Sequence, residues 1–502
     1  MNDTFHLIEK QFLDRLSALS PTGTVAKAGR VATSCDGVVM IEGLQDVKNG
    51  ELIFLGEDRY ALALNLEHDM VGAVLLSGEN EVSAGDFAYA THRIAAVPVG
   101  EATLGRVLNP LGHPLDGGSV VESNVYRDLE SPAPTIWQRA KVDSPLQTGV
   151  KAIDSIVPIG KGQRELIIGD RQTGKSALCI DAIINQKGKD VICVYVAIGQ
   201  KSSTIRKVID DLSEHGAMDY TVVVAATAAH SASLQYLAPY TGTAIAEEFM
   251  YRGKDCLIVY DDLSKHAVAY RTISLLLKRP SGREAYPGDI FYLHSRLLER
   301  SAHLSPALGG GSMTALPVVE TLSGDISAYI PTNVISITDG QIYLESELFH
   351  AGIRPAINVG LSVSRVGSAA QCNAIKKVSK QIRLDLAHYR EMTLFARFGA
   401  DLDQQTKATL ARGERLTESL KQGRYKTKSV CDMTAELYVV THKSILEGVP
   451  TDKVQPLMEA LLQTLHREQG DMMRRIEQEG DFAPADIELV AEYAKKLVAA
   501  MQ

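Results

Sequence analysis

The sequence contains no apolar run that approaches the ~18 consecutive residues that a membrane-spanning helix requires. Its opening residues, Met1 to His6, lack the basic and apolar regions of a secretory signal peptide. The six cysteines stand far apart and include no Cys-x-x-Cys pair, so neither a zinc site nor a disulfide framework is indicated. The formal net charge of -9 is opposite in sign to the basic excess of a general nucleic-acid-binding protein. These absences favour a soluble chain in a reducing cytosol, without a nucleic-acid partner.

The composition is that of an ordinary globular protein, with 45% hydrophobic and 23% charged residues in a chain of 502. This length predicts about three domains. Residues 1–23 carry apolar side chains at spacings of three and four, at Phe5, Ile8, Phe12 and Leu16. The spacing predicts a short amphipathic helix, which either packs on its own domain or docks to another subunit.

Three further stretches differ in pattern. Residues 24–92 hold short apolar runs between Gly and Asp turns, at 38–41, 52–55 and 71–75, which predicts a small all-β barrel or sandwich with an assembly role. Residues 93–371 alternate strand-like runs with helix-length segments, which predicts a parallel sheet that binds ligands at its carboxyl edge; the runs are 166–168, 191–196, 221–225 and 256–260. Residues 372–502 show helical periodicity over 374–398, 404–420, 433–445, 454–473 and 485–501, which predicts a helical bundle.

A glycine-rich segment stands between the apolar residues 166–168 and a helical run over 176–186, and it consists of Gly169, Asp170, Arg171, Gln172, Thr173, Gly174, Lys175 and Ser176. This spacing and these flanks are typical of a phosphate-binding loop. The glycines let successive backbone N–H groups point at one phosphate, and the helix N-terminus adds positive potential there. Lys175 supplies charge for the outer phosphates, and Ser176 is the expected Mg²⁺ ligand. The segment predicts a nucleotide site.

Two carboxylates, Asp261 and Asp262, end the apolar run over residues 256–260. P-loop enzymes place an acidic Mg²⁺-water acceptor at the end of a buried strand, and we assign this role to Asp261. We expect its strand to lie next to the strand that carries the phosphate loop. The simpler alternative is that both aspartates cap the following helix, because Asp is a favoured N-cap residue.

The strand expected over residues 191–196 leads into Gln200, where a hydrolysing relative would carry a carboxylate that polarises the attacking water. A glutamine cannot accept a proton as a carboxylate can, so nucleotide could bind here without efficient turnover. Some GTPases orient water with glutamine, so the amide predicts lowered activity rather than none.

Several segments together resemble the alpha subunits of F-type ATP synthases: the phosphate loop, 194–201 (Val-Tyr-Val-Ala-Ile-Gly-Gln-Lys), 260–265 (Tyr-Asp-Asp-Leu-Ser-Lys) and 286–296 (Tyr-Pro-Gly-Asp-Ile-Phe-Tyr-Leu-His-Ser-Arg). Residues 355–358 (Pro-Ala-Ile-Asn), followed by Ser362 and Ser364, resemble the signature that alpha and beta subunits share. The resemblance covers nearly the whole chain. It implies an N-terminal helix (1–23), a small β-barrel (24–92), a RecA-like P-loop domain with a parallel sheet (93–371) and a C-terminal helical bundle (372–502). It also implies that the chain holds ATP or ADP with Mg²⁺ without turning it over, and Gln200 is consistent with this.

The resemblance also assigns roles to residues outside the loop. Arg365 matches the arginine that alpha subunits extend across an interface to the nucleotide on a beta subunit. Arg354 and Pro355 match positions near the adenine of the alpha site, and Gln422 matches a glutamine that contacts the base. Arg424 departs from the family pattern, because many alpha subunits have a second glutamine there.

The partners that the resemblance implies are beta subunits in an alternating ring, a central gamma-type shaft facing residues 398–403, and delta-type or peripheral-stalk subunits reached by the N-terminal helix. Contact with the membrane would be made only through the membrane sector, at the cytoplasmic face of the cell inner membrane. Two other functions stay open: a self-sufficient P-loop ATPase that orients water with Gln200, and a ring-shaped nucleic-acid translocase, which the acidic charge disfavours. The coupling ion is chosen by membrane subunits, and the sequence of this chain does not give the physiological direction of turnover.

Overall fold

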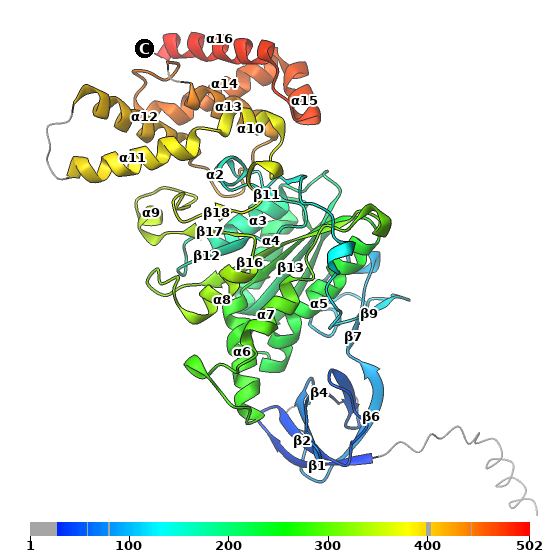
Figure 1. The fold of residues 1–502 in the computed structure, drawn as a ribbon. Helices are drawn as coiled ribbons and strands as arrows, with labels where there is room; N and C mark the ends of the chain where they lie inside the picture. The colour runs from blue at the N-terminus through cyan, green and yellow to red at the C-terminus, as the bar shows by residue number, and fades with distance from the viewer. Residues whose placement is uncertain (1–27, 58, 79–80, 398–402, 443, 502) are drawn as a thin grey trace, which may run out of the picture. The chain divides into compact units, whose positions relative to one another are not determined.

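The computed structural model describes residues 28–501 except 58, 79–80, 398–402 and 443 (Figure 1). The helix expected within residues 1–23 and most of the loop expected to face a shaft lie outside the described residues. The chain divides into two compact units, Met1–Ala95 and Ala96–Gln502. The finer domain limits given above stay predictions.

The first unit contains a closed antiparallel barrel with the strand order β1-β2-β5-β4-β3-β6. Its strands are β1 (Ala28–Cys35), β2 (Val38–Glu42), β3 (Glu51–Phe54), β4 (Tyr60–Leu66), β5 (Met70–Leu75) and β6 (Phe87–Ile94). Val39, Ile41 and Ile53 are buried in its core, because alternate residues of a strand point to the same face. Of the two all-β architectures expected from the sequence, the barrel is the one found.

The second unit is built around an eight-stranded sheet in which only the edge strand β18 runs antiparallel to its neighbour. In spatial order the strands are β18 (Val363–Ser364), β17 (Gly340–Leu344), β12 (Leu166–Gly169), β16 (Ser312–Glu320), β15 (Asp255–Asp261), β13 (Val191–Gln200), β14 (Thr221–Thr227) and β8 (Val107–Leu108). Two small antiparallel pairs accompany it, β7 (Ala96–Pro98) with β9 (Tyr126–Asp128) and β10 (Pro145–Leu146) with β11 (Ile159–Gly160). The central strands are buried along almost their whole length, which is typical of a sheet covered on both faces.

Helices follow the strands as the alternating pattern predicts (Figure 1): α2 (Lys151–Ile156), α3 (Lys175–Ile184), α4 (Ser202–Glu214), α5 (Ala232–Tyr251), α6 (Leu263–Leu276), α7 (Ile290–Leu298), α8 (Tyr329–Ile337) and α9 (Ser346–His350). Helix α5 packs against β13, β14 and β15. The parallel sheet with its covering helices confirms the expected nucleotide-domain architecture.

The order of the sheet corrects one expectation. Strand β16 lies between β12 and β15, so the strand that carries Asp261 is not the neighbour of the phosphate-loop strand. The chain reaches β16 only after passing through β13, β14 and β15, and sequence periodicity alone does not give the spatial order of parallel strands.

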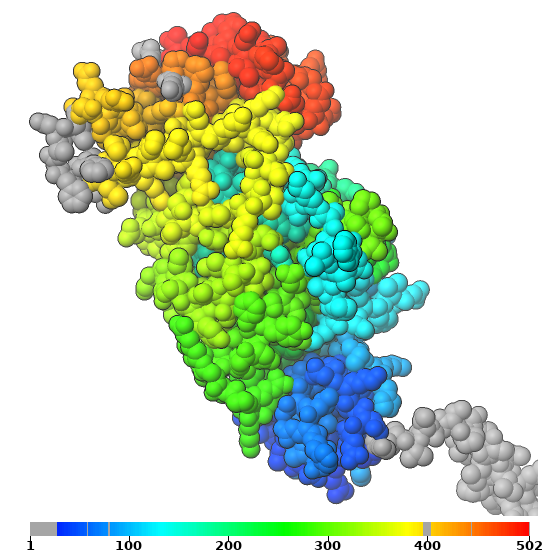
Figure 2. All heavy atoms as spheres, in the orientation of Figure 1, coloured from blue at the N-terminus to red at the C-terminus, as the bar shows by residue number. Residues whose placement is uncertain are grey.

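The C-terminal part is helical, with α10 (Asn373–Ser379), α11 (Ile382–Arg397), α12 (Gln404–Leu420), α13 (Val430–Thr441), α14 (Val454–Glu468), α15 (Gly470–Glu479) and α16 (Pro484–Met501). This part holds the yellow to red atoms of Figure 2, and leucines in it such as Leu457, Leu461 and Leu465 are fully buried. The helical bundle is therefore confirmed.

Three helix limits in this part differ from the prediction. The helix expected over 454–473 is broken at Gln469, whose φ of -128° is not helical and which precedes Gly470, a residue of low helix propensity. The helix expected over 433–445 begins earlier, because the Ser429 side chain accepts a hydrogen bond from the Asp432 N–H and caps it, and it ends at Thr441. The helix expected over 374–398 is interrupted at residues 380–381.

Among the described helices, none combines the length and the low charge that a bilayer crossing needs.

Candidate functional site

The carboxyl ends of β12, β15 and β13 bring three predicted site residues together. Ser176 Oγ donates a hydrogen bond to Asp261 Oδ2 at 2.6 Å, and Gln200 Nε2 donates to the Asp261 backbone carbonyl at 2.9 Å. The Tyr195 hydroxyl donates to the same Asp261 oxygen at 2.7 Å. Sequence reasoning missed Tyr195, although it stands within the strand that leads to Gln200. These contacts link the start of α3 to the ends of β15 and β13.

The phosphate loop turns sharply between β12 and α3. A Cβ on Gly169 would lie 2.4 Å from the Leu344 carbonyl oxygen, so only glycine fits where the loop leaves the sheet. Gly174 has φ +101° and caps the N-terminus of α3, a backbone conformation that glycine adopts readily. The Thr173 hydroxyl donates to the Asp170 carbonyl at 2.8 Å and closes the turn. The local sequence therefore produces the helix N-terminus at which anions bind in proteins.

Lys175 is buried within this turn. Its Nζ donates to the carbonyls of Gly169 at 2.8 Å and of Asp170 at 2.6 Å, and burial lowers the pKa of the lysine. The lysine side chain thus lies along the loop and does not extend into solvent. An ammonium group in this position is placed for pairing with the outer phosphates of a nucleotide.

The rest of the loop is held by its acidic and basic side chains. Asp170 accepts hydrogen bonds from Thr321 Oγ1 at 2.6 Å and from the Gly324 N–H at 2.9 Å. Exposed Arg171 forms an ion pair with Glu320 at 3.0 Å, and Gln172 has φ +63° within the turn. Glu320 ends β16 directly beside Gly169, and sequence reasoning missed it because β16 itself was missed.

The two aspartates that end β15 have separate roles. Asp262 Oδ1 accepts from the Lys265 N–H at 2.8 Å and caps α6, and burial raises its pKa to about 6. Asp261 makes no such cap and turns to Ser176. A hydroxyl and a carboxylate in contact at a helix N-terminus are oxygen donors of the kind that Mg²⁺ prefers. The pair Ser176 and Asp261 therefore fits a magnesium ion, and the capping alternative is correct only for Asp262.

The residues assigned to the adenine pocket meet within the second unit, where the C-terminal helices join the part that contains the sheet. The Gln422 N–H donates to the carbonyl of Arg354, the residue before Pro355, at 2.8 Å. The Arg354 guanidinium lies over the Phe349 ring, 4.4 Å from its centroid. The Gln422 side chain, however, is already paired with the backbone. Its oxygen accepts from the Lys151 N–H at 3.0 Å, and its amide donates to the carbonyls of residues 149 and 426 at 2.7 and 2.6 Å.

Arg424 belongs to a cluster that sequence reasoning did not find. Its guanidinium pairs with Asp211 at 2.9 Å and lies over the Tyr425 ring at 4.4 Å. The Tyr425 hydroxyl donates to Asp211, and the Tyr425 N–H donates to Asp181 Oδ1 at 2.8 Å. Burial raises the pKa of Asp181 to about 6. The cluster ties the segment around residue 424 to α3 and α4.

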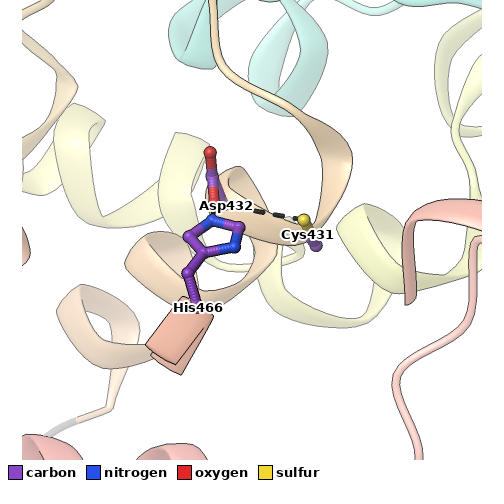
Figure 3. Close-up of side chains that lie close together, drawn as sticks. All are labelled: Cys431, Asp432 and His466. Carbon is purple, nitrogen blue, oxygen red and sulfur yellow. Dashed lines mark hydrogen bonds and ion pairs between the residues drawn. The ribbon is translucent and has the colours of Figure 1, made fainter. Parts of the chain in front are cut away.

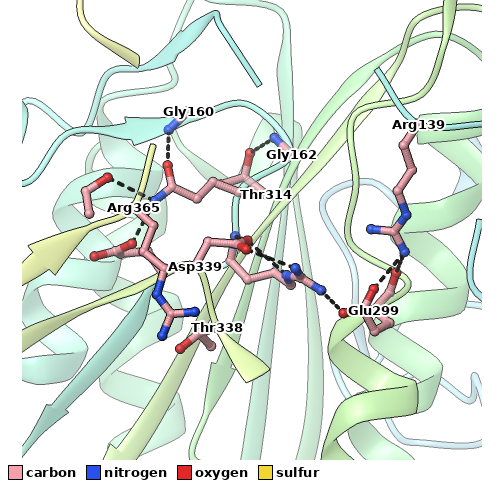
Figure 4. A network of polar contacts seen from close by, with 12 residues as sticks. Arg139, Gly160, Gly162, Glu299, Thr314, Thr338, Asp339 and Arg365 are labelled. Carbon is pink, nitrogen blue, oxygen red and sulfur yellow. Dashed lines mark hydrogen bonds and ion pairs between the residues drawn. The ribbon is translucent and has the colours of Figure 1, made fainter. Parts of the chain in front are cut away.

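Arg365 lies beside Asp339 (Figure 4). The strand register places it at the opposite end of the sheet from the phosphate loop. Its predecessor Ser364 pairs with Gly340 at the start of β17, whereas Gly169 pairs with Leu344 at the end of that strand. Four residues of extended strand separate these positions by about 13 Å, so Arg365 does not reach its own chain's loop. The side chain is exposed, and its guanidinium donates a long hydrogen bond of 3.4 Å to the Ile335 carbonyl.

A further cluster joins Cys431 and Asp432, in the first turn of α13, to His466 near the end of α14 (Figure 3). His466 Nε2 lies 2.7 Å from Asp432 Oδ1, which makes an ion pair across the two helices when the histidine is protonated. Burial raises the pKa of Cys431 to about 12. We interpret the cluster as a tie between helices.

Two family models match the sequence. The model described as ATP synthase alpha/beta family, nucleotide-binding domain, matches residues 149–364. The model described as ATP synthase alpha/beta chain, C terminal domain, matches residues 371–497. The first range contains the phosphate loop, Gln200 and Asp261, and it ends directly before Arg365.

Curated proteins are similar over nearly the whole chain. The sequence is 56% identical over 475 residues to ATP synthase subunit alpha of Caldanaerobacter subterraneus subsp. tengcongensis, which covers 94% of each chain. It is 54% identical over 477 residues to the protein of the same name from Acetivibrio thermocellus, covering 95% of this chain and 94% of the relative. For the Clostridium acetobutylicum protein of that name, the identity is 54% over 485 residues, with 96% and 95% covered.

Proposed function

The chain belongs to the ATP synthase alpha/beta family, and from this we propose that it is a non-catalytic, nucleotide-binding alpha-type subunit of a rotary ATP synthase. In this role it binds ATP or ADP in its own phosphate loop and completes catalytic sites on neighbouring beta-type subunits with Arg365. The names of the curated relatives and the two matched domains support the subunit assignment.

One observation carries the proposal: the nucleotide loop and Arg365 lie at opposite ends of the sheet. An exposed arginine about 13 Å along the strand from its own loop is placed for a nucleotide on another subunit. Phosphoryl transfer develops negative charge, and a guanidinium supplied from outside stabilises that charge in the transition state. The geometry therefore supports action in trans.

At the loop end, the residues bind nucleotide but offer little for its hydrolysis. Lys175 and the N-terminus of α3 receive the phosphates, and Ser176 with Asp261 would hold Mg²⁺, which offsets phosphate charge when bound. Gln200 is fixed by its bond to the Asp261 backbone, and its amide cannot take the proton of an attacking water. A regulatory site follows from this combination, and a self-sufficient ATPase is disfavoured for the same reason.

The wider assembly is part of the proposal. Beta-type subunits alternate with this chain in a ring, a gamma-type shaft faces residues 398–403, and the N-terminal helix meets delta-type or peripheral-stalk subunits. The chain then lies peripherally at the cytoplasmic face of the cell inner membrane, reaching the membrane only through the membrane sector. Its family membership disfavours the nucleic-acid translocase.

Native purification from the source, with mass measurement of everything that copurifies, tests the proposal. We expect equal numbers of this chain and a beta-type subunit, together with shaft subunits and bound adenine nucleotide. A homomeric ring that is retained on single-stranded RNA at low salt, without beta-type subunits, would overturn it.

A further inference from the structure

Arg365 is carried by little secondary structure of its own. It follows β18, a strand of two residues that pairs with β17 only at Gly340 and Gln341. Its exposed guanidinium has one long bond, to the Ile335 carbonyl at 3.4 Å. The position of the Arg365 Cα is therefore fixed by contacts of the neighbouring backbone and of Ser364.

The Ser364 hydroxyl uses its full bonding capacity. It donates to the Pro158 carbonyl at 2.7 Å, and it accepts from the Gly367 N–H at 3.2 Å and from Gln163 Nε2 at 3.1 Å. One hydroxyl thus links the residue before Arg365 to the turn after it and to two segments far away in the sequence. Of these links, the one to Gln163 is made by a side chain.

The Gln163 side chain is completely buried, and both its amide oxygen and its amide nitrogen form hydrogen bonds. Its oxygen accepts from the Gly160 N–H at 2.8 Å, and its nitrogen donates both to Ser364 and to Glu165 Oε2, the latter at 2.8 Å. The Glu165 carboxyl is buried beside Gly340, since a Cβ on that glycine would lie 2.5 Å from Glu165 Oε2. Gln163 therefore connects the turn before β12 to both strands of the β17–β18 edge.

A second anchor holds the backbone of Arg365 itself. The Arg365 N–H donates to the Asp339 carbonyl at 2.8 Å, and the Asp339 carboxylate accepts from Arg164 Nε and Nη2, both at 2.9 Å. Arg164 also pairs with Glu299, which in turn pairs with Arg139 at 2.8 Å. Residues 163 and 164, directly before β12, thus fix Ser364 and Arg365 from two sides.

We propose that Gln163 is a positioning residue for Arg365, because its buried amide fixes Ser364 and with it the origin of the arginine side chain. The proposal rests on the proposed role of Arg365 in trans. Catalytic groups that are displaced by about 1 Å can lose 10²-fold in rate. A change at Gln163 should therefore weaken the action of the arginine at a neighbouring site without touching that nucleotide.

The test uses the reconstituted complex with Gln163→Leu, which keeps a buried side chain of similar size but removes all three hydrogen bonds. We expect kcat to fall by about 10- to 100-fold while KM changes little. Gln186→Leu is the matched control, since that glutamine is also buried and bonds two carbonyls, at 2.9 and 2.7 Å, after the far end of α3. It should keep turnover within about two-fold of wild type.

A double variant distinguishes positioning from a structural role. The fold loss caused by Gln163→Leu is measured in the wild-type and in the Arg365→Ala background. Slow hydrolysis rates are followed under single-turnover conditions, with the complex in excess over ATP. Positioning predicts no further loss in the Arg365→Ala background, because the group being positioned is gone. The same fold loss in both backgrounds would show a merely structural effect and overturn the proposal. So would wild-type turnover in Gln163→Leu.

Ser364→Ala provides a second variant if Gln163→Leu fails to assemble. It removes the hydroxyl at the other end of the link, and a kcat loss that again vanishes in the Arg365→Ala background is expected. Unchanged turnover in Ser364→Ala would overturn the proposal. If Arg365→Ala itself kept more than about a tenth of turnover, the proposed function and the positioning role would both be wrong. An inactive Arg365→Ala with a fully active Gln163→Leu would refute only the latter.

Discussion

The two ends of strand β12 present different functional groups: the loop end carries the phosphate loop, and the arginine end lies beside Arg365. At the carboxyl end, the chain turns into the phosphate loop, where Lys175 is buried against two carbonyls. At the amino end, Gln163 and Arg164 hold the segment from which exposed Arg365 projects. The first end carries the phosphate loop with an amide, Gln200, in place of a base. The second end, about 13 Å along the strand, carries a cation, Arg365, that we propose acts on a transition state in a neighbouring subunit.

Under the proposed function, this difference lets one sheet serve two nucleotides. Parallel strands place ligands at their carboxyl edge, which fixes the chain's own site. At the opposite end, the antiparallel strand β18 adds Arg365, which we propose meets a neighbouring subunit. Changes at one end should therefore be separable from changes at the other.

The largest expected effect is at the arginine end. An arginine finger is typically worth ~10³ to 10⁵ in rate, or about 4 to 7 kcal/mol of barrier. Arg365→Ala should reduce steady-state hydrolysis by the reconstituted complex to this extent. Arg365→Lys should fail nearly as badly, because lysine keeps the charge but loses the two-pronged geometry.

Both arginine variants should assemble in normal subunit ratios and keep nucleotide in this chain's own loop. If Arg365→Ala retained more than about a tenth of wild-type turnover, the role in trans would be refuted.

A large effect on binding is expected at the loop end. Lys175→Ala removes the buried ammonium and should weaken ATP binding to this chain by at least ~10²-fold, because charge-assisted bonds to phosphate are lost. Hydrolysis by the assembled complex should remain largely present. Equilibrium binding to the isolated chain and turnover of the complex are measured side by side. A complex of normal composition without residual hydrolysis would contradict the separation of the two ends.

A smaller effect is expected for Asp261→Asn, which removes the charge beside Ser176. Binding of Mg-ATP should weaken by about ten-fold, whereas binding of ATP in the presence of a chelator should hardly change, since Mg²⁺ prefers ionised oxygen ligands. Asp262→Asn is the matched control. Asparagine is an equally good helix cap, so Mg²⁺ dependence should stay as in wild type. Equal effects of the two substitutions would refute the assignment of the metal to Asp261.

The smallest effect concerns stability near the loop end. Burial raises the pKa of Asp181 to about 6 from the model-peptide 3.8, so the folded state holds this proton more tightly than the unfolded state does. Stability should therefore fall as pH rises from about 4 to 6, and the loss persists above that range. Asp181→Asn should raise stability at pH 7.5 by about 1–3 kcal/mol, which thermal unfolding would detect as a few degrees in Tm.

The same substitution should make no difference near pH 4, and Asp210→Asn, at a half-exposed position, should change Tm little at either pH. A destabilised Asp181→Asn at pH 7.5 would mean that the ionised carboxylate is needed by the Tyr425 N–H.

The parts that the sequence predicted are those with local causes. The loop from Gly169 to Ser176 needs glycine at fixed places, which the sequence displays directly. Asp261 is recognisable because it is the first acidic residue after an apolar run. Strand β16 and its terminal Glu320 were missed. The place of β16 between β12 and β15 depends on long crossovers, which periodicity along the sequence does not reveal.

Contacts between distant segments had no signal in the sequence. Arg164 and Asp339 are 175 residues apart. The hydrogen bonds of the Gln422 side-chain amide to backbone groups depend on how the helical bundle packs against the part that contains the sheet. The resemblance placed Arg365, Arg354, Pro355 and Gln422 at candidate sites, and these roles stay predictions.

The central claim is that the loop end binds nucleotide without turning it over. The most direct test measures equilibrium binding of Mg-ATP and release of phosphate on the same preparation of the isolated chain. We predict saturable binding with negligible phosphate release. Saturable binding with steady turnover near the ~10 s⁻¹ of a working enzyme would contradict the claim.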